Sequence, residues 1–297
     1  MKVAILKERH ANETRVAATP DTVKKMIGLG LSPCVETGAG LASSFLDEAY
    51  EAAGARIAKT ARAALKDAGV VLKVRGPSAD ELKAFPKGAL LAAVLDAHDE
   101  GASLDKYAQA RVDAFAMELM PRITRAQSMD VLSSQSNLAG YRAVIDAAGA
   151  FTRAMPMMMT AAGTVAPARV LVMGAGVAGL QAIATAKRLG AIVSATDVRP
   201  AAKEQVESLG ANFVMVESEE TQQAETAGGY AREMSEDYQR QQAELIAETI
   251  KKQDMVICTA LIPGRPAPLL VSEDMVRSMR PGSVVVDLAV ERGGNCA

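Results

Sequence analysis

The stretch RVLVMGAGVAG, residues 169–179, joins an apolar run to a glycine-rich turn, and an apolar helical pattern follows it from 180 to 189. Its glycines, Gly174, Gly176 and Gly179, have the spacing G-x-G-x-x-G. In that spacing the first glycine permits a tight turn, the second lets a phosphate approach the backbone, and the third lets the helix pack closely against the strand. The free N–H groups at the start of the helix attract phosphate. The stretch therefore predicts a strand, a phosphate-binding turn and a helix of a parallel α/β unit.

A second apolar run, residues 192–197, ends at Asp197. In dinucleotide-binding units an acid about 20 residues beyond the glycine turn accepts hydrogen bonds from the adenosine ribose hydroxyls. The strand, turn, helix and acid together predict a dinucleotide site. The acid favours NAD(H) over NADP(H), because a carboxylate repels a 2′-phosphate. Arg199 is the type of residue that binds a 2′-phosphate, but the neighbouring acid argues against that role.

Composition excludes several other classes of protein. The chain has 297 residues, enough for two α/β domains, and its formal net charge of −2 provides no basic field for nucleic acid. Aromatic residues make up 3%, so base-stacking platforms are not expected. Three widely separated cysteines and two histidines predict neither a disulfide framework nor a metal centre. The sequence pattern predicts no signal peptide and no membrane span.

Strand and helix patterns alternate along the first half of the chain. Thr19 and Pro20 are typical of a helix start, as cap and first helical residue. Alternation of this kind predicts a parallel sheet that is covered on both faces. The expected strands are residues 3–6, 33–36, 70–74, 89–95 and 114–117, and the further helices are 46–53, 60–67 and 104–110.

The second half of the chain predicts a Rossmann unit. Residues 135–151 are interpreted as a helix that links the halves, and the methionines of 155–159 as core filling. The predicted fold class is α/β with two doubly wound parallel-sheet domains, residues 1–134 and a Rossmann dinucleotide-binding domain of residues 135–297. Because a six-stranded domain of this kind needs a further strand and helix, we expect it to be truncated at its C-terminal end. Its expected strands are 169–173, 192–197, 212–216, 255–259 and 283–288.

A long polar insert, residues 217–240, interrupts the second half and contains Gly228, Gly229 and Tyr230. An insert of this length inside a compact α/β unit is either disordered filler or a functional lid. We favour a lid, because nucleotide sites need closing. The two glycines would form its hinge, and Tyr230 would be its large amphipathic side chain.

A polar segment, MELMPRITRAQSMDVLSSQSN at 117–137, follows a predicted strand, and the carboxyl ends of strands are where α/β sites form. Its arginine can clamp a phosphate or carbonyl, and its Gln, Asp and Ser can hold the carboxamide and ribose of a nicotinamide. On pattern alone, a capped loop whose polar groups satisfy one another is an equally good interpretation. The residues concerned are Arg122, Gln127, Asp130 and Ser133.

Several long runs resemble one family. KERHANETRVAATPDTVKK, residues 7–25, matches a pattern that alanine dehydrogenases and proton-translocating transhydrogenases share. More discriminating are PRITRAQSMDVLSSQSNLAGYRAV, MMMTAAGTVAPARVLVMGAGVAGLQAIATAKRLGA, ETAGGYA and VVVDLAVERGGNC. With these runs the whole chain resembles the NAD(H)-binding domain I, or alpha subunit, of proton-translocating NAD(P) transhydrogenase.

The resemblance implies roles for individual residues. Arg122, Gln127, Asp130 and Ser133 would hold the nicotinamide and its ribose against a partner that carries NADP(H). Gly229 and Tyr230 would belong to a mobile loop, with further contacts at Gln242 and Leu261. The contacts near the adenosine side would come from Ala175, Gly176, Val177, Asp197, Val198 and Arg199.

The resemblance also implies partners. These are an NADP-binding component, a transmembrane component that moves protons, and a second copy of the chain in a homodimer. The location implied is peripheral, on the cytoplasmic face of the inner membrane through the partner subunits. No nucleic acid, metal or direct membrane insertion is expected.

Two alternatives remain: a module that binds NAD without catalysis alone, and, within the same family, alanine dehydrogenase. Its substrate-carboxylate positions match Arg15 and Lys73, which are present. Its proton-handling His matches Leu95 or Asp96, with His98 displaced. Because hydride transfer between two nicotinamides needs only positioning on this chain, the missing His favours transhydrogenase.

Overall fold

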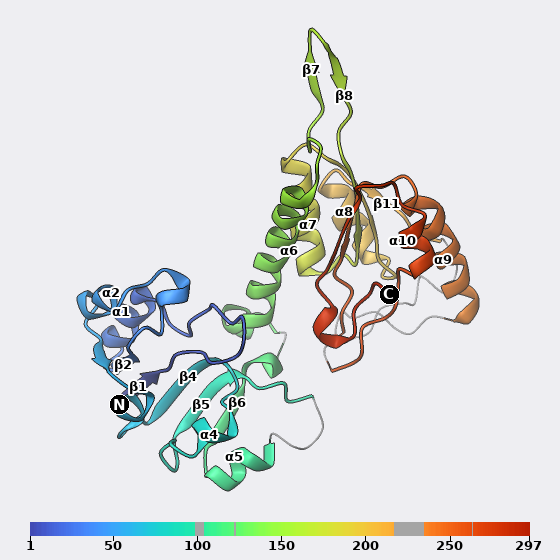
Figure 1. Ribbon diagram of the computed structural model, residues 1–297. Helices are drawn as coiled ribbons and strands as arrows, with labels where there is room; N and C mark the ends of the chain where they lie inside the picture. The colour runs from blue at the N-terminus through green and yellow to red at the C-terminus, as the bar shows by residue number, and fades with distance from the viewer. Residues whose placement is uncertain (99–103, 122, 217–234, 263) are drawn as a thin grey trace. The chain divides into compact units, whose positions relative to one another are not determined.

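The computed structural model describes residues 1–98, 104–121, 123–216, 235–262 and 264–297 (Figure 1). They divide into two compact units, Met1–Val131 and Leu132–Ala297. The division falls three residues before the boundary expected from the sequence. Each unit contains one parallel sheet, so the fold class is α/β, as predicted.

The sheet of the first unit has six parallel strands in the order β3-β2-β1-β4-β5-β6. The central strand β1 pairs with β2 on one side and β4 on the other. Because both faces are covered, the strands carry apolar side chains almost continuously. Their bounds are β1 Lys2–Ile5, β2 Ser32–Glu36, β3 Arg56–Ala58, β4 Val70–Arg75, β5 Leu90–Val94 and β6 Asp113–Ala116.

Helix α1, Pro20–Gly28, begins as predicted: Thr19 Oγ1 accepts the N–H of Thr22, and Pro20 occupies the first helical position. Two separate apolar clusters cover the two faces of the sheet. The other helices of this unit are α2 Asp47–Ala52, α3 Ala61–Leu65, α4 Ala79–Leu82 and α5 Leu104–Ala110, with 3₁₀ turns η1 Leu41–Ser43, η2 Met117–Leu119 and η3 Thr124–Met129.

The sheet of the second unit has five parallel strands in the order β11-β10-β9-β12-β13. Strand β9 is Arg169–Met173, with the bounds expected from the sequence, and it lies between β10 and β12. The strands that follow β9 in the chain are placed first on one side of it, as β10 and β11, and then on the other side, as β12 and β13. The point where the strand order reverses, between β9 and β12, is the place where α/β sheets bind ligands. The remaining strands are β10 Ile192–Thr196, β11 Asn212–Phe213, β12 Met255–Cys258 and β13 Val284–Asp287.

Helices cover the second sheet, and α6 lies beside α7 (Figure 1). The contact between these two is unusually close, because a Cβ added at Gly140 of α6 would lie 2.0 Å from the carbonyl oxygen of Ala178 in α7. The glycine therefore fixes α6 against the first turn of α7. The helices are α6 Val131–Ala150, α7 Val177–Arg188, α8 Ala201–Ser208, α9 Glu236–Ile250 and α10 Glu273–Arg277, with the 3₁₀ turn η5 Val290–Arg292.

The interpretation of residues 155–159 as core filling is wrong for most of the cluster. Met155 is buried, but Met157, Met158 and Met159 are 59%, 49% and 73% exposed. The segment enters an antiparallel hairpin of β7, Met158–Thr160, and β8, Gly163–Val165, that projects away from the sheet (Figure 1). Apolar composition alone does not distinguish a core segment from an exposed hairpin.

Two other boundaries differ from expectation. The linking helix begins at Val131 rather than at 135, so it includes a serine-rich turn that has low helix propensity. The polar insert expected to reach residue 240 is shorter, because α9 begins at Glu236, where Ser235 Oγ accepts the N–H of Tyr238. Residues 217–234, which hold the expected lid, lie outside the described residues.

Candidate functional site

The glycine-rich turn leaves β9 in the shape that close phosphate approach requires. Gly174 has φ of 98°, which favours glycine, and its N–H donates to Thr196 O at 2.9 Å. A Cβ at Gly179 would lie 1.8 Å from the carbonyl oxygen of Gly174, so only glycine lets the helix pack on the turn. A Cβ at Gly176 would meet nothing within 4 Å. The second glycine therefore faces open space, where a ligand can approach.

The first turn of α7 has backbone N–H groups that can donate hydrogen bonds to a ligand. Gly176 is its N-cap, and no side chain caps the helix there. The first intrahelical bond at this end runs from Leu180 N to Gly176 O. The backbone N–H groups before Leu180, together with the positive end of the helix dipole, suit a diphosphate. Ala175 is buried and Val177 is 38% exposed at this edge.

Asp197 lies at the end of β10, but its carboxylate is engaged within the protein. Its Oδ2 accepts the N–H of Ala175 at 2.8 Å and Arg199 Nη2 at 2.8 Å. Its Oδ1 accepts both the backbone N–H and Nε of Arg199 at 2.9 Å. These four donors match the roughly four acceptor positions of a carboxylate. A ribose hydroxyl can therefore bind Asp197 only by exchange with one of them, which the sequence did not indicate.

Gln242 of α9 also connects elements at this sheet edge. Its Nε2 donates to Thr196 Oγ1 at 2.8 Å, and its Oε1 accepts the N–H of Val216 at 3.1 Å. Val198 is partly buried and packs with Tyr238 and Val216. Leu261 lies just after β12 and is 42% exposed. The second unit thus brings together the sequence-predicted residues of its strand ends: Gly174, Ala175, Gly176, Val177, Gly179, Asp197, Val198, Arg199, Gln242 and Leu261.

Two residues that support the glycine turn, Thr259 and Asn295, were not indicated by the sequence pattern. Thr259 Oγ1 donates to Gly174 O at 2.9 Å and lies 2.8 Å from the position of a Cβ on Gly174. Asn295 is fully buried, and its amide both accepts the N–H of Ala260 at 3.0 Å and donates to Ala260 O at 2.8 Å. They fix the loop after β12 beside the glycine turn. Burial of a lone Asn carries no sequence signal.

The polar segment after β6 contributes to both units. Gln127 is exposed on η3, and Asp130 follows it at the end of the first unit. The N–H of Asp130 donates to Gln127 O at 3.3 Å, so the two residues form one turn. Ser133 lies on α6 in the second unit. Three residues assigned by resemblance, Arg122, Gly229 and Tyr230, lie outside the described residues.

Two family descriptions together cover almost the whole chain. Residues 4–139 match "Alanine dehydrogenase/PNT, N-terminal domain", and residues 143–297 match "Alanine dehydrogenase/PNT, C-terminal domain". The chain belongs to the alanine dehydrogenase/PNT family. An NAD(P) transhydrogenase alpha-subunit protein of Rhodospirillum rubrum is 59% identical over 301 residues, which cover 100% of this chain and 78% of that protein.

Within the alanine dehydrogenase/PNT family the chain is more similar to transhydrogenase subunits than to alanine dehydrogenases. A solved transhydrogenase structure from Sinorhizobium meliloti has a TM-score of 0.87 at 57% identity and covers 100% of this chain and 80% of that chain. Alanine dehydrogenase of Bacillus subtilis is 32% identical, covering 99% of this chain and 72% of that protein. The relatives at 46–59% identity are named as alpha subunits, so they are parts of larger assemblies.

Two residues that we expect to match substrate-carboxylate positions of alanine dehydrogenases, Lys73 and Arg15, are each paired with acids in the first unit. Lys73 is fully buried, with Nζ 3.0 Å from Glu81 Oε1 and 3.6 Å from Glu8 Oε2. Arg15 Nη2 lies 2.7 Å from Glu13 Oε2. A hollow of about 210 Å³ is lined in part by Glu8, Glu13 and Arg15. The charges of Lys73 and Arg15 are thus each paired with an acid of the same unit.

The end of β5 holds the two residues that we expect to match the proton-handling position of alanine dehydrogenases, Leu95 and Asp96. Leu95 is buried in the apolar cluster beside β5, so Asp96 is the residue that presents a polar side chain at this strand end. Asp96 has φ of 54° and is half exposed, with Oδ2 4.0 Å from Arg75 Nη1. His98 is exposed. Of the two residues expected to match the histidine of alanine dehydrogenases, only Asp96 therefore carries an ionisable side chain.

Replacement of Glu13 by glutamine is expected to reduce the acid sensitivity of this fold. Hydrogen bonds from Arg15 hold the pKa of Glu13 at about 2, below its ordinary 4.5. A depressed folded-state pKa stabilises the fold above about 4.5, and that contribution is lost as the pH falls towards 2. Urea unfolding across this range should show a shallower loss of stability in Glu13→Gln. Glu273→Gln, at an exposed acid, is the matched control. If wild type and Glu13→Gln lose stability equally as the pH falls, the lowered pKa of Glu13 does not contribute to acid sensitivity.

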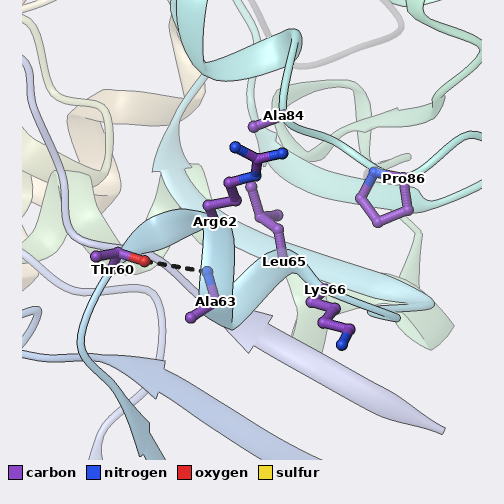
Figure 2. A pocket seen from close by; sticks show the side chains of 7 residues that line it. All are labelled: Thr60, Arg62, Ala63, Leu65, Lys66, Ala84 and Pro86. Carbon is purple, nitrogen blue, oxygen red and sulfur yellow. Dashed lines mark hydrogen bonds between the residues drawn. The ribbon is translucent and has the colours of Figure 1, made fainter.

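A second hollow of the first unit lies away from these groups. It measures about 490 Å³ beside α3 and is lined by residues that include Arg62, Leu65, Lys66 and Pro86 (Figure 2). No sequence-predicted site residue lines it. We place the site at the strand ends instead, because the donors and the acid converge there. Among the described residues, no three His, Cys, Asp or Glu side chains form a metal cluster, and no helix is long and apolar enough to cross a membrane.

Proposed function

We propose that this chain is the NAD(H)-binding subunit of a proton-translocating NAD(P) transhydrogenase. The observation that carries the proposal is 59% identity, over the whole chain, with a subunit of that enzyme. In the proposed reaction a hydride passes from NADH on this chain to NADP⁺ on a separate component, and membrane components couple that step to proton movement. The protein must then position the reacting ring and exclude water, with no acid or base supplied by this chain.

The strand ends of the second unit support NAD(H) as the bound nucleotide. The open face of Gly176 and the uncapped start of α7 suit the pyrophosphate. Asp197, Val198 and Arg199 follow the neighbouring strand, where the adenosine ribose is bound in this class of fold. The acid disfavours a 2′-phosphate, so we propose NADH in preference to NADPH.

The segment after β6 supports a nicotinamide-presenting role. Gln127 is exposed, and a carboxamide there can pair with the carboxamide of the ring. Asp130 and Ser133 can accept from and donate to ribose hydroxyls, and Arg122 completes the proposed set. Three apolar side chains in the same segment, Leu119, Ile123 and Met129, are 48–55% exposed. Exposed apolar groups around a polar loop suit docking of the NADP-binding component.

The β7–β8 hairpin supports self-association. Every residue of its two strands is exposed, including the apolar Met158 and Met159, and Met157 just before β7 is exposed too. A two-stranded hairpin is marginally stable alone. We therefore propose that a second copy of the chain covers it in a homodimer. The assembly would be peripheral, held on the cytoplasmic face of the inner membrane by its transmembrane partners.

The alanine dehydrogenase alternative is weaker, although Arg15 and Lys73 are retained. That reaction needs a group that moves a proton at the amino-acid nitrogen or its carbonyl. An aspartate at position 96, with Leu95 buried beside it, is a poor replacement for a histidine near neutral pH. A transfer between two nicotinamides does not need this group.

The two functions are distinguished by activity with and without a partner. The purified chain should bind NADH but should not oxidise it with pyruvate and ammonia. It should reduce an NADP⁺ analogue when a purified NADP-binding transhydrogenase component is added. Oxidation by pyruvate and ammonia alone would indicate alanine dehydrogenase. Binding of NADH with neither activity would contradict the proposal and leave a binding module.

A further inference from the structure

Helix α6 rests directly on the backbone of the phosphate-binding turn. A Cβ added at Gly140 would lie 2.0 Å from the carbonyl oxygen of Ala178, 2.8 Å from its carbonyl carbon and 3.0 Å from its Cα. All three atoms are backbone, so no rotation of a side chain can make room. Ala178 is two residues beyond Gly176, whose open face suits the pyrophosphate. The absent side chain at Gly140 thus sets the distance between α6 and the first turn of α7.

A side-chain contact joins the same two helices. Asn137 Nδ2 of α6 donates to Gln181 Oε1 of α7 at 3.2 Å. Gln181 Nε2 donates in turn to Thr185 Oγ1 at 3.1 Å. Because Asn137 and Gly140 are three residues apart, they lie on one face of α6. That face therefore contacts α7 through both backbone and side chain.

The start of α6 carries a residue of the proposed nicotinamide pocket. Ser133 precedes Asn137 by four residues and Gly140 by seven, so all three lie on one face of the helix. Seven residues of α-helix span about 10 Å. Asp130 immediately precedes the helix. One rigid segment therefore connects the phosphate-binding turn to Ser133.

The two helices are not held equally firmly. In α7, Ala182 and Ile183 are fully buried, and Gly179 packs against the carbonyl of Gly174. In α6, Gly140 is the first buried residue, because residues 131–139 are all partly or fully exposed. A group inserted between the helices should therefore displace the start of α6 and leave α7 in place.

We propose that Gly140 is a positioning residue for hydride transfer, which acts by holding Ser133 and the start of α6 at a fixed distance from the phosphate-binding turn. A dinucleotide bound at that turn by its pyrophosphate then meets Ser133 with its nicotinamide end in a single place. Gly140 acts through the helix. The inference rests on the proposed function and deepens it by naming what aligns the two ends of the site.

The first test is Gly140→Ala, with Gly149→Ala as the matched control on the same helix. Gly140→Ala should slow single-turnover hydride transfer to the NADP-binding component on the order of tenfold, because the start of α6 is displaced. Its equilibrium NADH affinity should change by no more than about threefold, since the pyrophosphate contacts remain. A Cβ at Gly149 meets nothing within 4 Å, so Gly149→Ala should change neither quantity.

A second set of variants perturbs the same contact without a backbone clash. Asn137→Ala and Gln181→Ala should each slow transfer several-fold while NADH affinity remains. The double variant should be no slower than Gln181→Ala alone, because both changes remove one hydrogen bond. Arg142→Ala, which removes an exposed ion pair with Asp146 on α6, is the control and should change neither rate nor affinity.

The split between rate and affinity separates positioning from a purely structural role. Gly140→Ala with wild-type transfer, or with rate and affinity reduced equally, would overturn the inference. If Gly140→Ala does not fold, unchanged transfer in Asn137→Ala and Gln181→Ala would overturn it instead. Transfer by the wild-type chain leaves the proposed function standing in each of these cases. A wild-type chain that transfers no hydride to the NADP-binding component would contradict both.

Discussion

Replacement of Gly179 by alanine is expected to destabilise the second unit and to remove most of its NADH affinity. The added Cβ would lie 1.8 Å from the carbonyl oxygen of Gly174, which is backbone and cannot rotate away. Either α7 or the turn must shift, at a cost of about 3 kcal/mol. The same shift moves the N–H groups that face the pyrophosphate. We expect NADH binding to weaken on the order of 100-fold, about 2.7 kcal/mol.

Two further glycine variants separate packing from ligand access. A Cβ at Gly149, on α6, meets nothing within 4 Å, so Gly149→Ala should leave both stability and binding intact. A Cβ at Gly176 also meets no protein atom. Gly176→Ala should therefore fold normally yet weaken NADH binding, because the methyl group occupies the approach of the phosphate. Thermal unfolding and NADH titration give both quantities. A Gly179→Ala protein with wild-type melting temperature and affinity would contradict the geometry of the turn.

Replacement of Gln127 by asparagine is expected to slow hydride transfer much more than it weakens NADH binding. The side chain is exposed, so stability should change by no more than about 0.5 kcal/mol. Shortening it by one methylene withdraws the carboxamide by about 1 Å, and a misplacement of that size can cost about 100-fold in rate. The adenosine and pyrophosphate contacts remain, so most of the affinity remains.

Two measurements separate the effect on rate from the effect on affinity. One is the rate of single-turnover hydride transfer to an NADP⁺ analogue on the partner, and the other is equilibrium binding of NADH. Gln109→Asn, at an exposed position of α5, is the matched control. A Gln127→Asn chain that transfers hydride at the normal rate, or whose only defect is lost affinity, would show that Gln127 does not position the ring.

The features that the sequence predicted well are those with a local physical cause. The turn at Gly174 to Gly179 follows from three positions where backbone atoms crowd or φ is positive. The cap at Thr19 and the proline after it specify a helix start without help from distant residues. Alternation of buried strands with helices then implies two parallel sheets. Local signals were sufficient for these features.

The features that the sequence did not reveal depend on distant or side-chain partners. Strand β3 has only three residues, Arg56–Ala58, and forms because β2 offers an edge to pair with. The methionines near 158 resemble core residues in composition, which does not show that they belong to a projecting hairpin. The engagement of Asp197 by Arg199 is a rotamer choice that no spacing rule encodes. Asn295 accepts a hydrogen bond from the N–H of Ala260, which is 35 residues away in the chain.

In the proposed function, this chain presents NADH for direct hydride transfer to a separate NADP-binding component. The most direct test is one turnover with NADH deuterated at C4, the purified NADP-binding component and an NADP⁺ analogue, in ordinary water. We predict that deuterium appears at C4 of the reduced NADP analogue and that none is lost to solvent. We predict also that no transfer occurs without the partner. Deuterium lost to water, or label recovered in alanine when pyruvate and ammonia are supplied without the partner, would contradict direct transfer between the two nucleotides.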